Sequence, residues 1–384
     1  MNLKIKSKNI VLSDGLFDGY IGIENGRIAG ISEKDFPADR FWNFGDMYVS
    51  AGFIDIHNHG GGGFAFADSS SEEVLKGCEF HLRHGTTSIL PTVSAGRFEA
   101  MRASVANIAA AMRSGKAKTN ILGAHLEGPY LSAKQCGAQC PDFITLPIEK
   151  DYTSLINDYG KYIARWTYAP ENDEKGEFCR YLTKHGLLAS AGHSEADYRD
   201  MRIAQENGCR LVTHLYSCTS TVTRQNGFRR LGIIESAFLS DDLYVEIIAD
   251  GKHLPPELIK MIVKIKGIGH TALVTDCLSV AGTDKSEGEM CGTEYIIEDG
   301  VCKLKNRTAF AGSIATADRL LRVLIRDCGA DIVSAVKMLT ETPAGILSLP
   351  EKGKLKIGCD ADLAVFDENI DVKAVFVNGE TVEF

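Results

Sequence analysis

Between about residue 50 and residue 350, the sequence repeats one unit: a short apolar strand followed by a helix with one apolar face. In the first complete unit, residues 86–93 are predicted as a strand and residues 98–113 as a helix. This alternation predicts an α/β fold with a parallel sheet, and its length of about 300 residues favours a (β/α)₈ barrel. Further predicted strands cover residues 121–126, 187–191, 211–215, 244–249 and 272–275, and further helices cover residues 70–83, 198–207, 256–266 and 317–328.

The two ends of the chain have a different pattern from this middle region. Both contain short strands separated by turn dipeptides such as Asn25-Gly26 and Asn378-Gly379. Neither end is long enough to cover both faces of a sheet, so we expect the two ends to pair. The sequence therefore predicts a small discontinuous β domain from residues 1–50 plus 350–384, and a barrel domain over residues 51–349.

Composition limits the class of partner and the compartment. The 51 acidic and 42 basic side chains give a net charge of −9, and no basic cluster is dense enough to indicate nucleic-acid binding. The 11 cysteines form no C-x-x-C pair, so a reducing compartment fits better than a disulfide framework. Because no run of about 18 apolar residues and no apolar leader occurs, we expect a cytoplasmic protein that does not bind membranes.

Five of the apolar segments end in a side chain that can bind a metal ion or transfer a proton. In a parallel barrel the carboxyl ends of the strands form one face, so these side chains should converge there. Two of them, His57 and His59, stand two apart on one strand and can therefore reach one ion from the same side. The complete set is His57, His59, Glu127, His193, His214 and Asp276.

This donor set indicates one or two divalent ions. Four imidazoles and a carboxylate suit zinc, iron, manganese or nickel, and the identity of the metal stays open. Asp276 is left as an acid–base group beside the ions. Alone, either His193 or His214 would more often be a core histidine, so the prediction depends on the combination.

Other candidate residues favour structural interpretations. His125 has the same strand parity as Glu127 but is more often structural, and His81 and His84 lie one helical turn apart. The glycines at 60–63 lack the Lys-Ser/Thr ending of a phosphate-binding loop, which indicates a tight turn.

The order of these motifs resembles the amidohydrolase superfamily, and within it the branch that deacetylates N-acetyl amino sugar phosphates. HLEGP followed by AGHS, THLY and IIADG is specific to this branch. The resemblance implies a (β/α)₈ barrel with a small β-sandwich built from both termini, and a homodimer. The matching stretches are GFIDIHNHGGGG, GTTSILPT, HLEGPYLS, AGHS, THLY, IIADGKH, LVTD, AGS and KGKLKIGCDADLAVFD.

The resemblance also implies a reaction and roles for particular residues. The reaction is hydrolysis of the acetamido group of N-acetylglucosamine 6-phosphate or a near relative, which gives acetate and an amino sugar phosphate. Glu127, His193 and His214 match the principal metal ligands of the branch, and Asp276 matches its catalytic aspartate. Some members lack the His-x-His pair and hold one ion. The presence of the pair in this sequence therefore favours a second ion. Positions that match substrate contacts are the main chain of Ala138, then Ser217, Cys218, His253, Phe310, Ala311 and Gly312.

The chain departs from the branch where the sugar phosphate binds. Ser217 and Cys218 stand where Asn-Ala is usual, and TSTVTRQNGFRRLG stands where an Arg-Glu-Pro-Gly stretch is usual. In the branch, this arginine reaches the phosphate across the dimer interface. Its counterpart here is Arg224, Arg229 or Arg230.

Three alternatives stay open. One is a deacetylase of a related N-acyl amino sugar, such as N-acetylgalactosamine 6-phosphate or an unphosphorylated sugar. Another is a hydrolase of cyclic amides or purines, against which Glu127 counts because cyclic-amide hydrolases usually carry a carboxylated lysine at this place. The last is a non-catalytic homologue, against which the complete set of ligands counts.

Overall fold

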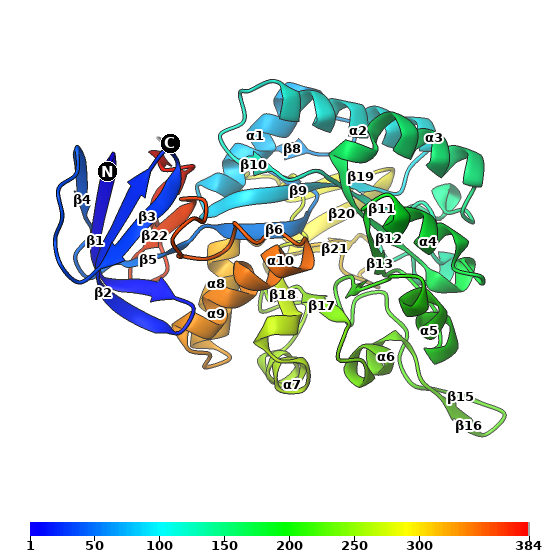
Figure 1. The fold of residues 1–384 in the computed structure, drawn as a ribbon. Coiled ribbons are helices and arrows are strands. Elements are labelled where there is room, and N and C mark those ends of the chain that lie inside the picture. Colours follow the sequence, from blue (N-terminus) through cyan, green and yellow to red (C-terminus); the bar gives the residue numbers. More distant parts are fainter. Residues whose placement is uncertain (383–384) are drawn as a thin grey trace.

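A nearly closed barrel of parallel strands forms the centre of the molecule (Figure 1). The computed structural model describes residues 1–382. The sheet runs in the order β10-β9-β11-β12-β13-β14-β17-β18, and β6 also pairs with β9. Beyond β18, the N–H of Asp276 donates to the carbonyl of His57 at 3.0 Å, which brings the two ends of the sheet together. The strands are β6 (Phe53–Asn58), β9 (Thr86–Ser94), β10 (Asn120–Ile121), β11 (Ala124–Glu127), β12 (Ile163–Tyr168), β13 (Leu188–Ala191), β14 (Leu211–Val212), β17 (Tyr244–Ile247) and β18 (Thr271–Leu273).

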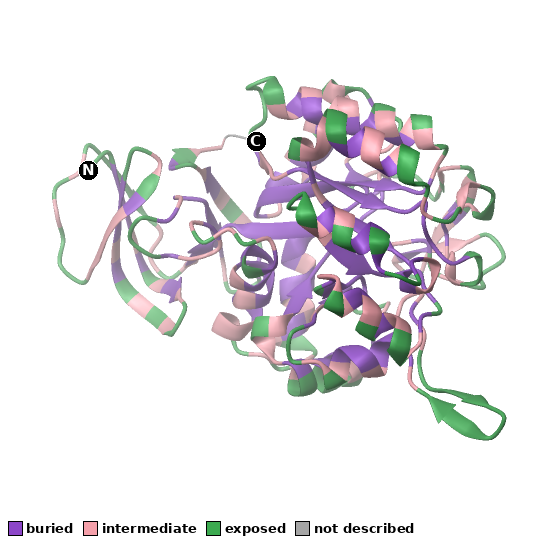
Figure 2. Ribbon diagram, turned by 45° about the vertical axis from the view of Figure 1, so that its right-hand side comes forward, coloured by how far each residue is buried: buried purple, intermediate pink, exposed green. Residues whose placement is uncertain are grey.

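Helices surround this barrel with their buried faces turned inward (Figure 2). The first begins as predicted, because the hydroxyl of Ser70 accepts from the N–H of Glu73 while the Glu73 carboxylate accepts from the N–H of Ser70. All five predicted helices are confirmed to within a few residues. The helices are α1 (Ser71–Leu82), α2 (Phe98–Arg113), α3 (Glu149–Tyr159), α4 (Glu177–Lys184), α5 (Tyr198–Glu206), α6 (Ile233–Leu239), α7 (Pro256–Lys266), α8 (Ala317–Arg326), α9 (Ile332–Leu339) and α10 (Glu341–Ile346), with short 3₁₀ turns at Ala133–Gln135, Pro141–Phe143, Gly160–Tyr162, Pro170–Asn172 and Ile268–His270.

Strands from both ends of the chain share a second sheet beside the barrel (Figure 1). Its order is β24-β23-β22-β5-β1-β2-β3, and β4 pairs with β1. Within this sheet, the strands of the two chain ends pair at β22·β5, which is antiparallel and places Leu363 opposite Ala51. The strands are β1 (Leu3–Leu12), β2 (Gly15–Glu24), β3 (Arg27–Ser32), β4 (Arg40–Asn43), β5 (Tyr48–Ala51), β22 (Leu363–Phe366), β23 (Val372–Val377) and β24 (Glu380–Thr381).

Three small β elements depart from the strand–helix alternation. The hairpin of β15 (Thr223–Gln225) and β16 (Phe228–Arg230) is fully exposed and projects away from the body (Figures 1 and 2). A three-stranded sheet of β19 (Glu287–Met290), β20 (Thr293–Glu298) and β21 (Val301–Leu304) follows β18. The predicted tight turn at the glycine run is the small hairpin of β7 (Gly60–Gly61) and β8 (Phe64–Ala65).

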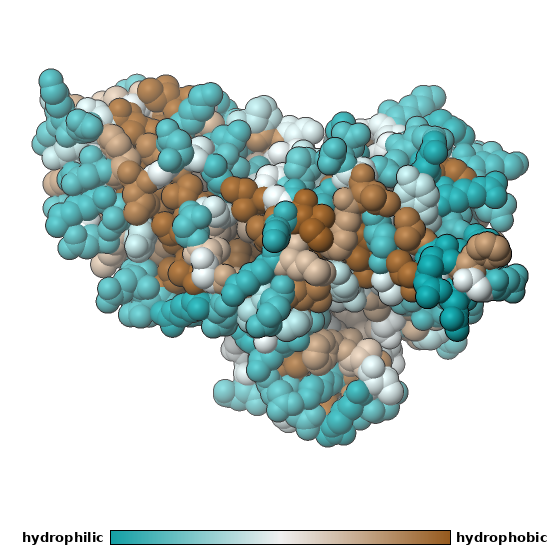
Figure 3. All heavy atoms as spheres, turned by 90° about the horizontal axis from the view of Figure 1, so that it is seen from below, coloured by the Kyte–Doolittle hydropathy of each residue, from teal (hydrophilic) through white to brown (hydrophobic). Residues whose placement is uncertain are grey.

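The surface mixes hydrophobic and hydrophilic side chains. Helices α6 and α7 lie at the bottom of Figure 1 and carry the exposed residues Leu239, Met261 and Ile265. The face seen from below accordingly shows hydrophobic patches bordered by hydrophilic side chains (Figure 3). Within residues 1–382, no helix combines the length and the apolar character needed to cross a bilayer.

The interior of the barrel contains a polar layer that the sequence analysis did not predict. Barrel interiors are usually filled by branched apolar side chains. Here Arg165 of β12 and Glu246 of β17 are buried inside together with Thr167, Ser190 and Thr213. This layer lies next to the residues that the motifs single out.

Candidate metal centre

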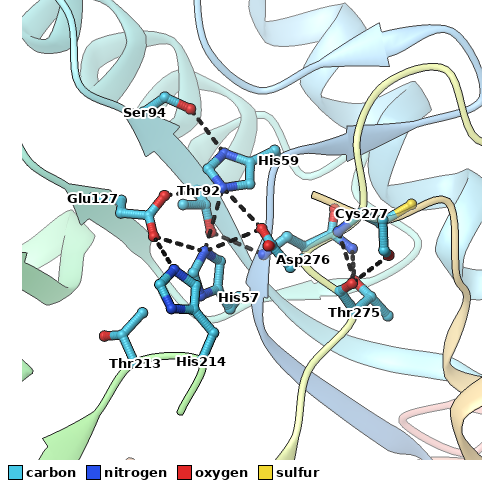
Figure 4. A network of polar contacts seen from close by, with 12 residues as sticks. His57, His59, Thr92, Ser94, Glu127, Thr213, His214, Thr275, Asp276 and Cys277 are labelled. Atoms are coloured by element: carbon cyan, nitrogen blue, oxygen red, sulfur yellow. Dashed lines mark hydrogen bonds and ion pairs between the residues drawn. The ribbon is translucent and has the colours of Figure 1, made fainter. Parts of the chain in front are cut away.

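The six side chains predicted to converge do meet at the carboxyl ends of the barrel strands. Figure 4 shows five of them, and it places the Glu127 carboxylate beside the rings of His57, His59 and His214. The sixth, His193, follows β13. All six are less than a tenth exposed.

A first ligand cluster consists of Glu127, His193 and His214. The Nε2 atoms of His193 and His214 each lie 3.1 Å from Oε1 of Glu127 and 3.1 Å from each other. Donor atoms around a tetrahedral zinc ion stand roughly 3.4 Å apart. The spacing of this cluster therefore fits one divalent ion.

A second ligand cluster consists of His57, His59 and Asp276. The Nε2 atoms of the two histidines lie 3.3 Å apart. Oδ1 of Asp276 lies 3.2 Å from Nε2 of His59 and 3.5 Å from Nε2 of His57. Glu127 also contacts this cluster, because its Oε1 lies 3.3 Å from His57 Nε2 and its Oε2 lies 3.1 Å from His59 Nε2. Glu127 thus joins the two clusters.

The other ring nitrogens show how the imidazoles are oriented. Nδ1 of His193 donates to the carbonyl of Gln135 at 2.9 Å, which leaves Nε2 as the lone-pair atom facing Glu127. Nδ1 of His59 lies 2.9 Å from the hydroxyl of Ser94 (Figure 4). Nδ1 of His214 has no hydrogen-bond partner among the described residues. Nitrogen lone pairs directed at one carboxylate form a donor set that a divalent cation satisfies.

Three of the six residues have a left-handed backbone. The φ angles are 48° at His193, 26° at His214 and 47° at Asp276. Such conformations are uncommon for non-glycine residues, although His and Asp adopt them more often than most. They cost about 1–3 kcal/mol each and concentrate at functional sites. The chain turns sharply at the ends of these strands and thereby directs the three side chains into the site.

The charges of the site favour ionised carboxylates. Burial alone would raise the pKa of Glu127, but His57, His193 and His214 outweigh it and hold that pKa well below its usual value. Burial also opposes ionisation of Asp276, yet the neighbouring His57 and His59 lower its pKa to about 2. For His57, burial is outweighed by Glu127 and Asp276, which raise its pKa to about 10. Both carboxylates thus stay ionised beside positive charge on the imidazoles, a charge that a bound cation could supply instead.

A cavity of about 240 Å³ opens onto both clusters. Among the predicted substrate contacts, it is lined by Ala138, Ser217, Cys218, His253, Phe310, Ala311 and Gly312. His253 is oriented by Asp250, whose Oδ2 lies 2.9 Å from its Nδ1, and its ring meets that of Phe310 at 4.9 Å.

The three predicted arginines are not part of this cavity. Arg224, Arg229 and Arg230 lie on the exposed β15–β16 hairpin. None of the described residues that line the cavity is a lysine or an arginine. Within residues 1–382, the wall of this cavity therefore supplies no fixed positive charge from lysine or arginine.

Sequence reasoning missed one polar residue of the site and the pair beneath it. The side-chain amide of Gln139 donates to Oε2 of Glu127 at 2.7 Å, and its oxygen accepts from the N–H of Ala95 at 2.9 Å. Beneath the site, Arg165 and Glu246 form a buried ion pair. Their signal in the sequence is a charged residue inside an otherwise apolar strand.

Three other histidines, for which the sequence favours structural roles, contact residues that are not predicted ligands. His125 lies 3.0 Å from the hydroxyl of Thr92 and 2.7 Å from that of Thr167. His81 lies 2.9 Å from the carbonyl of Gly60. His84 lies 3.3 Å from Oδ1 of Asp318.

Comparison with known proteins places the chain among enzymes of one family. The chain is 31% identical to the N-acetylgalactosamine-6-phosphate deacetylase of Shewanella sp. (strain ANA-3), over 96% of this chain and 93% of that protein. It is also 31% identical to the N-acetylglucosamine-6-phosphate deacetylase of Caenorhabditis elegans, over 97% and 92%.

Solved structures agree with these relatives. A mutant of N-acetyl-D-glucosamine-6-phosphate deacetylase from Mycobacterium smegmatis, in complex with N-acetyl-D-glucosamine-6-phosphate, matches with a TM-score of 0.91 at 28% identity, over 99% of this chain and 98% of that one. The enzyme from Pasteurella multocida matches with a TM-score of 0.92 at 26% identity, over 99% of both chains. The model of the amidohydrolase family matches residues 48–382, and the chain therefore belongs to the amidohydrolase family.

Proposed function

We propose that the protein is a metal-dependent deacetylase that converts N-acetylglucosamine 6-phosphate to glucosamine 6-phosphate and acetate. The observation that carries this proposal is the position of Glu127, which joins four imidazole nitrogens and lies beside Asp276 at the base of the cavity. Relatives and solved structures named for this activity support it. N-acetylgalactosamine 6-phosphate is a second candidate substrate, favoured by the Shewanella relative.

The residues present fit one or two divalent ions, for which zinc, iron, manganese and nickel are the candidates. Glu127, His193 and His214 would hold the first ion. His57 and His59, with Glu127 and Asp276, would hold the second. When bound, such an ion lowers the pKa of water towards about 7 and polarises the acetyl carbonyl.

Asp276 is the proposed catalytic residue. With a pKa of about 2 it begins the reaction as a carboxylate and can accept a proton from the attacking water. It then delivers this proton to the departing nitrogen, because a neutral amine leaves more readily than an amide anion. The lining residues would hold the hexose: His253, the main chain of Ala138, Ser217, Cys218, Phe310, Ala311 and Gly312.

The proposed activity is tested by measuring acetate release from a small panel of sugars. We expect metal-loaded protein to hydrolyse N-acetylglucosamine 6-phosphate with the highest kcat/KM, with its galactosamine epimer next and both unphosphorylated sugars at least about tenfold slower. If no N-acetylhexosamine phosphate releases acetate, the proposed function is wrong.

The phosphate group would be bound by a second copy of the chain in a homodimer. The cavity contains no lysine or arginine among its described lining residues, whereas the projecting hairpin carries three arginines. Arg224 lies directly opposite Arg229 in the hairpin register. Arg230 is paired with Asp197 at 3.2 Å, whereas in the part of the chain that the structure describes neither Arg224 nor Arg229 forms an ion pair. Arg224 and Arg229 are therefore the preferred phosphate ligands.

Replacing Arg224 and Arg229 by Gln should lower kcat/KM for the phosphorylated sugar about 10–100-fold, because a charge-assisted bond to phosphate is lost. The same change should leave kcat/KM for plain N-acetylglucosamine within about twofold. Arg230→Gln is the matched control, and light scattering reports whether each variant stays dimeric. An equal loss on both sugars would contradict this role.

We also infer that residues 1–50, together with the described part of 350–384, which ends at residue 382, form a small β-sandwich domain separate from the barrel at 51–349. Its support is a separate apolar cluster that includes Ile5, Val49 and Phe376. Hydrogen exchange checks this division, since β1 and β22 should then exchange as one unit.

A cytoplasmic location is supported by the eleven cysteines, all free thiols, and is checked by cell fractionation.

A further inference from the structure

A buried ion pair crosses the barrel directly beneath the metal centre. Arg165 and Glu246 are both 0% exposed, and the guanidinium of Arg165 donates to both carboxylate oxygens of Glu246. The same guanidinium donates to the carbonyl of Ile56 at 3.2 Å, to the hydroxyl of Ser190 at 3.0 Å and to that of Thr213 at 2.7 Å. Its position is therefore fixed from several strands at once.

Glu246 also contacts one histidine of each ligand cluster. Its Oε2 lies 3.5 Å from Nδ1 of His57 and accepts from the backbone N–H of His214 at 3.4 Å. A carboxylate can only accept hydrogen bonds, so this contact favours a proton on Nδ1 of His57. Nε2 is then the ring atom left to bind an ion once its proton is released, and it faces Glu127 at 3.3 Å.

Stability alone does not explain why this pair is charged. Replacing a buried ion pair by well-packed apolar side chains of similar volume is often neutral or stabilising. The hydrolytic steps described above use neither Arg165 nor Glu246. The pair gives His57 a hydrogen-bond acceptor, the Glu246 carboxylate. Arg165 balances the negative charge of that carboxylate.

We propose that Glu246, paired with Arg165, is a positioning residue of the metal centre. It holds His57 in the tautomer whose Nε2 faces the ions, and it anchors the backbone of His214. It thereby sets the affinity for the ion that His57 binds. This inference rests on the proposed metal centre. Loss of such a partner of a metal ligand typically weakens metal binding about 10–100-fold.

The test compares two double variants, because removing one charge alone would leave its partner buried and unpaired. Arg165→Met with Glu246→Gln removes both charges but keeps an oxygen that accepts from Nδ1 of His57. Arg165→Met with Glu246→Leu removes both charges and also the acceptor. The Kd for Zn²⁺ is measured on metal-free protein by competition with a chelator, and melting of the metal-free proteins reports folding.

For the Zn²⁺ ion that His57 binds, we expect the Kd of the Gln variant to stay within a few-fold of the wild-type Kd. The Kd of the Leu variant should be about 10–100-fold higher. Equal affinities in two folded variants would overturn the inference and leave the metal centre standing. A wild-type chain that binds no Zn²⁺ would overturn both.

If a double variant does not fold, the position of the proton on His57 can be measured directly in the wild-type protein. In ¹H–¹⁵N NMR of the Zn²⁺-loaded protein, the ring of His57, assigned with a His57→Asn variant, should carry its proton on Nδ1. A proton on Nε2 instead would overturn the inference.

Discussion

Replacing Asp276 by Asn should lower kcat by about 10²–10⁴-fold, the range that a positioned acid–base group contributes. The amide has nearly the volume of the carboxylate, but it can neither accept the proton of water nor return one to the departing nitrogen. Because Oδ1 of Asp276 lies 3.2 Å from Nε2 of His59, the metal content must be measured together with the rate. The first ligand cluster lacks Asp276, so its ion should be retained.

Asp68→Asn is the matched control for this variant. Asp68 is exposed, lines a neighbouring cavity and has a φ of 56°, which asparagine tolerates well. The control should keep the wild-type kcat. If Asp276→Asn retained its ions and its kcat stayed within a few-fold of wild type, Asp276 would not be the acid–base group.

Replacing Glu127 by Gln should weaken divalent metal binding by more than about 100-fold and abolish measurable deacetylation. The expected loss exceeds the roughly 10–100-fold typical for residues that merely orient a ligand, because Glu127 contacts both clusters. Glutamine keeps the shape of the side chain but removes the charge that four imidazoles surround. Elemental analysis after dialysis gives the number of ions per chain.

Glu171→Gln is the corresponding control. Glu171 is partly buried and accepts from Ser194 and Glu195 in the loop that follows His193, and the hydrogen bonds of its carboxylate go to these residues and not to the predicted ligands. We expect this variant to keep its metal content while losing some thermal stability. Retention of two ions by Glu127→Gln would show that the clusters bind metal without their shared carboxylate.

Much of the barrel could be predicted from the sequence because the signals are local. The capping box at Ser70 and Glu73 marks the start of α1, and runs of β-branched residues mark strands such as β9. The convergence of His57 and Glu127 follows once the strands are parallel, since their carboxyl ends then share one face.

Other features depend on contacts that a sequence pattern does not contain. Strand β12 was not predicted, because Arg165 interrupts its apolar run and is accommodated by partners on other strands, above all Glu246 on β17. Histidine adopts a left-handed backbone more often than most residues, but residue type alone does not single out His193 and His214 as the positions where it occurs. Gln139 reaches Glu127 only because a loop of irregular structure folds back over the end of β11.

The sheet built from both chain ends has a consequence for the order in which the site can form during synthesis. Strand β5 ends at Ala51, and β6, which carries His57, begins two residues later. Between them the N–H of Gly52 donates to the carbonyl of Asp362 at 2.8 Å. A chain still emerging from the ribosome lacks this partner until residue 362 has been made. Strand β6 can pair with β9 before that point, but the turn between β5 and β6 gains its contact to Asp362 only afterwards.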